Sequence, residues 1–247
     1  MLIPNILLQQ LEELLAEVRT AQQHELKPLH RLHLYHTFNE SIDLSGSLYT
    51  RLVETNQLDL PKGQQKYIRL AILTARHVLP VWQQAGPAMV ARDDTLPVDL
   101  PQMMLDMAEG VLNSTISPNE ANNALCDDFY HTMGAIAYDI TYEVWCASNA
   151  AYSALKAVLG YKPFRIDKID VSVSDDTLSP GDGDVALSAL NAFTATDNDA
   201  PGVWAYTTKS HHPLSFDIQK RLEFWNWWLT EAIPQAWELA QETYKPQ

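Results

Sequence analysis

The stretch YDITYEVWCASNAAYSALKAVLGY, from Tyr138 to Tyr161, decides the fold, because it has no charged side chain between Glu143 and Lys156. A helix without a solvated face is buried on nearly every side. Its larger apolar residues recur at helical spacing, and the alanines and serines between them let neighbouring helices approach closely. Gly160 suits a left-handed C-terminal cap. We therefore predict an all-α protein, a bundle of many helices around this buried Ala/Tyr-rich helix.

The composition limits the partners of the chain. Its 247 residues are 46% hydrophobic, and its formal net charge is −14. This charge disfavours nucleic acid and anionic membrane, whose phosphates it would repel, and it favours basic partners. No long linker divides the chain, so we expect a single helical domain over residues 1–247.

The cysteines and the N-terminal segment indicate a cytoplasmic protein. Cys126 and Cys146 both lie in predicted helix, where they are interpreted as small buried hydrophobes instead of a disulfide or a zinc site. The apolar N-terminal segment has no basic region and reaches Glu12 too early for a signal peptide or a membrane-spanning helix.

Helical periodicity continues along most of the chain. A long helix is predicted from about Gly63 to Ala85, kinked at Pro80 and followed by a loop from Gly86 to Pro97. Ser117 begins a capping box, after which the pattern stays helical to Gly160, with Gly134 as the candidate for a bend. The first predicted helix runs from about Asn5 to His24 and has four residues on its buried stripe: Leu8, Leu11, Leu15 and Val18.

The segment from Lys162 to Trp204 differs from the rest, because it holds eight aspartates and only three basic residues. Apolar and polar residues alternate from Ile169 to Ser174, and a Ser-Pro-Gly turn follows. We interpret the segment as an acidic insertion, a solvated loop or small hairpin attached to the helical core. After it, a terminal helix is predicted from Ser215, with Pro234 beginning or kinking its second part.

Three pieces of the chain resemble a known family: ARHVLPVWQQAGP at Ala75–Pro87, LPVDLPQMMLDMAEGVL at Leu96–Leu112, and SNAAYSALKAVLG at Ser148–Gly160. Together they look like the all-helical immunity proteins of bacterial polymorphic toxin systems, specifically the fifth-numbered immunity family and its relatives. The resemblance spans roughly Leu70 to Tyr161. It implies a stoichiometric inhibitor of a cognate toxin, with no catalytic residue and no cofactor.

An acidic inhibitor can cover the basic active surface of a toxin by electrostatic complementarity. The partner expected from this reasoning is a basic toxin domain. The acidic insertion and two tryptophans are the candidate contacts, and the six residues are Asp175, Asp176, Asp182, Asp184, Trp204 and Trp227. On the terminal helix, Trp227 cannot share the core face of Trp225 and Leu229, so it could instead bind a partner.

Two patterns leave an enzymatic alternative open. Arg31 and His36 have the R-x4-H spacing of some all-helical ribonucleases, in which the arginine would stabilise a phosphate and the histidine would move a proton. Asp128 and His131 form one carboxylate-x-x-His pair, whereas helical di-metal sites use two such pairs. We therefore expect no metal and no catalytic group; a structural scaffold is the remaining alternative.

Overall fold

A computed structural model of the chain describes residues 3–38, 55–56, 60, 62–90, 97–164, 169–196 and 215–242. Within these ranges every long element is a helix, no strand forms, and a single antiparallel bridge pairs Ala195 with Phe216. The prediction of an all-α protein is confirmed. No helix in the described part of the chain combines the length and apolar character that a membrane span requires.

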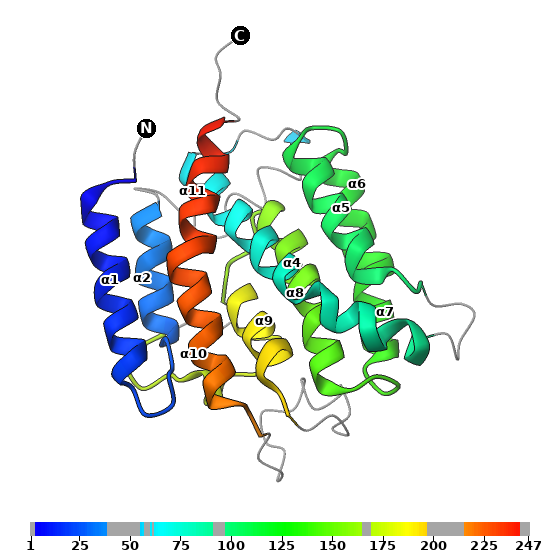
Figure 1. Cartoon of the computed structure of the whole chain (residues 1–247). Coiled ribbons are helices and arrows are strands. Elements are labelled where there is room, and N and C mark those ends of the chain that lie inside the picture. Colours follow the sequence, from blue (N-terminus) through cyan, green and yellow to red (C-terminus); the bar gives the residue numbers. More distant parts are fainter. Residues whose placement is uncertain are drawn as a thin grey trace.

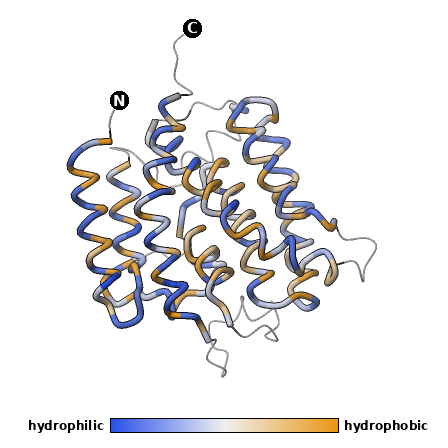
Figure 2. Tube along the Cα trace, in the orientation of Figure 1, coloured by the Kyte–Doolittle hydropathy of each residue, from blue (hydrophilic) through white to orange (hydrophobic). Residues whose placement is uncertain are grey.

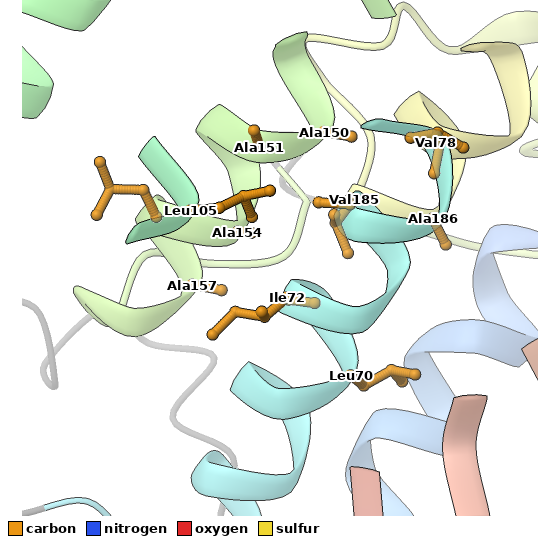
Figure 3. Packing of buried hydrophobic residues seen from close by; sticks show 14 of the residues in the cluster. Leu70, Ile72, Val78, Leu105, Ala150, Ala151, Ala154, Ala157, Val185 and Ala186 are labelled. Carbon is orange, nitrogen blue, oxygen red and sulfur yellow. The ribbon is translucent and has the colours of Figure 1, made fainter. Parts of the chain in front are cut away.

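The central helix is α8 (Tyr142–Val158), as predicted from its lack of charge. It packs against α4 (Lys62–Val90), α5 (Leu100–Leu112) and α9 (Val185–Thr194), so three neighbours cover it. Figure 3 shows Ile72 of α4 and Leu105 of α5 close to the alanines of α8. Gly160 follows α8 with φ of 80°, the left-handed conformation that glycine adopts at little cost.

A substitution at Ala151 can test how closely these helices pack. Only 1% of Ala151 is exposed, so a larger side chain there would have to fit between helices. Replacing Ala151 by tryptophan is expected to lower the free energy of unfolding by about 1–3 kcal/mol, since overpacking forces side chains off their preferred rotamers. Denaturant unfolding followed by circular dichroism measures the change. Ser153→Trp, at a partly exposed position of the same helix, is the control and should cost less. An unchanged stability of the Ala151 variant would mean that the site has free space.

The outer helices are amphipathic. Figure 1 shows α1 (Asn5–Thr20), α2 (Pro28–Phe38) and α10 (Ile218–Trp227) on one side of the molecule, and Figure 2 shows hydrophilic and hydrophobic residues alternating along them. The register predicted for α1 is partly wrong. Its buried face is formed by Leu7, Leu11, Leu14 and Val18, and Leu8 is exposed.

The helix α4 is longer than predicted, because it continues through Pro80 and Pro87 to Val90. Pro80 is exposed, so water can satisfy the backbone carbonyl that loses its partner there. Gly86 is needed for packing and does not begin a loop: a β-carbon there would lie 2.6 Å from the buried indole of Trp82. That indole donates a hydrogen bond to the Val98 carbonyl oxygen at 3.0 Å, which ties α4 to the start of α5.

The segment before α8 is also less regular than predicted. Ser117 caps α6 (Pro118–Asn123) by accepting a hydrogen bond from the Glu120 N–H. The chain then passes through the π-helix η1 (Ala124–Phe129) into α7 (Tyr130–Ile136). The helix ends after Ile136 and not at Gly134, and a short break precedes α8.

A second π-helical segment accommodates Pro234. The terminal helix runs as α10, η4 (Trp228–Ala232) and α11 (Ile233–Glu242), with Pro234 in the first turn of α11. Proline in a helix lacks the N–H of the usual i→i−4 bond, and its ring crowds the carbonyl four residues earlier. Widening the preceding turn to π geometry relieves that contact.

The largest departure from the sequence prediction is α9, which lies inside the segment interpreted as a solvated insertion. Nearly all of its residues are buried, and it packs against both α8 and α4. The expected hairpin is absent from the described residues of this segment, where 171 and 172 form a turn and 169, 170, 173 and 174 have no regular structure. The helix α9 therefore belongs to the hydrophobic core.

Candidate functional site

The most concentrated charge in the described chain is a buried cluster of one arginine and two aspartates. Nη2 of Arg31 donates to Oδ1 of Asp175 at 2.8 Å, and Nε donates to Oδ2 of Asp184 at 3.0 Å. Two further bonds of 3.1 Å make both contacts bidentate. The remaining N–H of Nη1 donates to the Leu26 carbonyl oxygen at 2.5 Å. All five N–H donors of the guanidinium therefore have acceptors.

Neighbouring groups hold this cluster in place. The Tyr35 hydroxyl donates to Oδ2 of Asp184 at 2.5 Å, and the Trp225 ring lies 5.2 Å from the guanidinium carbon. Asp184 is also the N-cap of α9, since its Oδ1 accepts a hydrogen bond from the Leu187 N–H. The cluster thus joins α2 and α10 to the first turn of α9.

The pKa values follow from burial and pairing. Burial raises the pKa of Asp175 to about 6, although Arg31 acts in the opposite direction. For Arg31, burial alone would lower the pKa, but the two carboxylates outweigh it and the pKa is raised. Burial and Asp184 together raise the pKa of Tyr35 well above its usual value, so its hydroxyl remains protonated and can donate.

Two of the proposed toxin contacts are therefore not solvated, and the interpretation of their segment as a surface loop is wrong for them. Asp175 is 4% exposed and Asp184 is 1% exposed. Removing either one would leave Arg31 with unpaired donors in the core, which costs stability. A replacement of all four aspartates proposed as contacts would for this reason destabilise the protein and could not report on binding alone.

The other two aspartates reach the surface. Asp176 accepts a hydrogen bond at 2.6 Å from Nη2 of Arg221, whose side chain is only 3% exposed. Asp182 is partly exposed and accepts one from the Ser179 hydroxyl at 2.7 Å. Of these four aspartates, three therefore pair with an arginine, whereas Asp182 bonds to a hydroxyl.

Of the two tryptophans proposed as toxin contacts, only Trp227 lies within the described residues. Trp227 is partly buried, and its ring stacks on His77 of α4 with the ring centroids 3.6 Å apart and an interplanar angle of 11°. Burial lowers the pKa of His77, which favours the neutral imidazole in this stack. Trp204 lies outside the described residues.

The ribonuclease interpretation of Arg31 and His36 is wrong in its geometry. Arg31 is fully buried and has no free donor for a phosphate, whereas His36 is exposed on the other side of α2. The spacing of five residues along a helix does not bring the two side chains together.

Asp128 and His131 are both exposed, on η1 and α7 respectively. Within the described residues there is no group of three or more His, Cys, Asp and Glu side chains that could hold a metal ion. Cys146 is buried as predicted, but Cys126 is exposed, which corrects that part of the prediction.

The sequence contains two signals for the buried cluster. Asp184 precedes the apolar run VALSALNAF, which is the pattern of an N-cap followed by a buried helix. Arg31 shares a helix face with Pro28, Leu34, Tyr35 and Phe38, so it had to be buried and therefore paired. Because the segment contains many aspartates, Asp184 was interpreted as one more solvated charge and not as the N-cap of a buried helix.

Comparison with known proteins identifies one family. The family model described as immunity protein Imm5 matches residues 11–235. The comparison with curated proteins gives no match.

Proposed function

The chain belongs to the Imm5 family of immunity proteins, and from this premise we propose that it neutralises a cognate bacterial toxin in the cytoplasm by direct stoichiometric binding. The family match carries the proposal, since it extends over most of the chain and includes all the helices around α8. The protein would act by covering the toxin, without catalysis and without a cofactor.

The negative net charge of the chain supports a basic partner. The net charge of −14 favours encounter with a toxin domain that is rich in Lys and Arg, as domains that act on nucleic acids commonly are. Electrostatic attraction of this kind raises the association rate and is weakened by salt.

The buried cluster argues against the alternative of a ribonuclease that uses Arg31. Every donor of Arg31 is used within the fold, so the arginine of the R-x4-H pattern is occupied by Asp175, Asp184 and Leu26. We infer that its role is structural.

The experiment first identifies a toxin domain encoded next to this gene and then inactivates it by mutation. Gel filtration with light scattering should show a complex of fixed stoichiometry, and the association rate should fall at least about tenfold between 0.05 and 0.5 M salt. Co-expression with the active domain should protect cells. A toxin domain from an unrelated gene pair is the control for specificity.

Absence of both complex and protection would contradict the proposal. Protection without a complex would mean that the protein acts on the product or target of the toxin, which would also contradict direct binding.

A further inference from the structure

Another stretch of the chain is acidic and has no basic residue of its own. Residues 93–155 contain ten Asp and Glu and no Lys or Arg. In residues 169–196, by comparison, three of the five aspartates pair with arginine: Asp175 and Asp184 share Arg31, and Asp176 pairs with Arg221.

Three helices of this acidic stretch, α5, α6 and α7, lie on one side of the molecule. Figure 1 shows α5, α6 and α7 on the side opposite α1 and α2. Arg76 of α4 reaches into it and pairs with Glu109 at 2.8 Å. Among the described residues, no Lys or Arg forms an ion pair with Asp127, Asp128 or Asp139, and all three are exposed.

Two tyrosines interrupt this acidic surface. Tyr130 is 57% exposed and Tyr138 is 73% exposed, the latter just after the end of α7. The Tyr130 ring also lies edge-on against His131, with centroids 5.6 Å apart. Tyrosine is enriched in protein interfaces, because a large ring with few rotatable bonds contributes contact area at a low entropic cost.

The local backbone explains why these side chains face outward. Phe129, Met133 and Ile136 form the buried side of this helical segment, each at most 4% exposed. The π-helical turn of η1 adds residues to the turn before α7, a feature that recurs at functional sites. A β-carbon added at Gly134 would meet no atom within 4 Å, so this stretch of the helix is uncovered. We name the outward side the η1–α7 face; it consists of Asp127, Asp128, Tyr130, His131, Tyr138 and Asp139.

We propose that the η1–α7 face is the docking surface for the toxin, with the two tyrosines as the central contacts and the three aspartates facing Lys and Arg of the partner. This inference rests on the proposed function and assigns a location to it. Exposed aromatic rings supply most of the binding energy in such contacts, whereas surrounding charges set the partner and the association rate.

The first test measures the dissociation constant with the inactivated toxin domain encoded next to this gene. Tyr130→Ala combined with Tyr138→Ala should weaken binding at least about tenfold. The matched control, Ile6→Ala with Val171→Ala, removes two other side chains that are 73% and 71% exposed, and it should leave the dissociation constant unchanged. Circular dichroism and melting temperature should match the parent for both variants, since none of these side chains is buried.

The second test concerns charge. Replacing Asp127, Asp128 and Asp139 by asparagine should lower the association rate about three- to tenfold at low salt and flatten its salt dependence. The control replaces three exposed acidic residues of α1 and α11, namely Glu12, Glu13 and Glu238, by glutamine. The control has the same net charge, so a specific effect of position appears as a difference between the two variants.

A third variant tests the competing location, combining Asp182→Asn with Trp227→Leu. If this variant loses binding while both η1–α7 variants bind like the parent, the docking surface lies beside α10 and the inference is overturned, although the immunity function stands. If the parent itself neither binds nor protects, the proposed function fails and the inference fails with it.

Discussion

Replacing Arg31 by methionine is expected to lower the free energy of unfolding by about 3–5 kcal/mol, because it leaves two carboxylates in the core without their cation. Asp175 and Asp184 would then have to be protonated, hydrated or expelled. The segment that includes α9 packs on α8 and α4, so its loosening would expose the centre of the molecule. Chemical denaturation followed by far-UV circular dichroism measures the loss.

A compensated variant separates the lost charge from the lost packing. In the triple variant Arg31→Met, Asp175→Leu, Asp184→Asn these three positions carry no charge, and asparagine can still cap α9. This variant should recover a large part of the stability. Arg31→Lys should recover little, because a single ammonium cannot make two bidentate contacts. A stability of Arg31→Met close to that of the parent would show that water reaches both carboxylates.

Replacing Trp228 by alanine is expected to cost a similar amount, about 3–5 kcal/mol, through the cavity that it leaves. Trp228 is fully buried in η4, and its ring packs edge-on against Tyr35 of α2 and Trp225 of α10. Its indole N–H donates to the Thr74 hydroxyl of α4 at 3.0 Å, so the substitution also removes a buried hydrogen bond.

The neighbouring Trp227→Ala is the control, because its ring is partly exposed and stacks on His77 at one side. It should cost clearly less than Trp228→Ala in the same denaturation experiment. Equal losses for the two variants would mean that the packing of η4 differs from that described.

The buried status of α8 could be predicted from sequence alone because it depends on local pattern. A helix that has no charge between Glu143 and Lys156 has no side that water can solvate, whatever its neighbours are. The N-cap at Ser117 and the left-handed Gly160 were predictable for the same reason, since caps involve residues only a few positions apart.

The chemical role of a charged residue could not be predicted in this way. Asp175 and Asp182 stand in the same acidic segment, yet one is buried against Arg31 and the other reaches the surface. The difference arises because α2 brings an arginine from 144 positions away in the sequence. The R-x4-H pattern left a ribonuclease alternative open for the same reason, as it gave the spacing of Arg31 but not its partners.

The sequence by itself therefore determined the class of the fold, its central helix and the overall negative charge, since these follow from composition and short-range periodicity. The tertiary structure decided which aspartates pair with an arginine in the core and which are exposed, as Asp127 and Asp128 are. The physical reason is that the energy of a charge depends on its solvation and on the distance to its partners, and both are fixed only when distant helices pack.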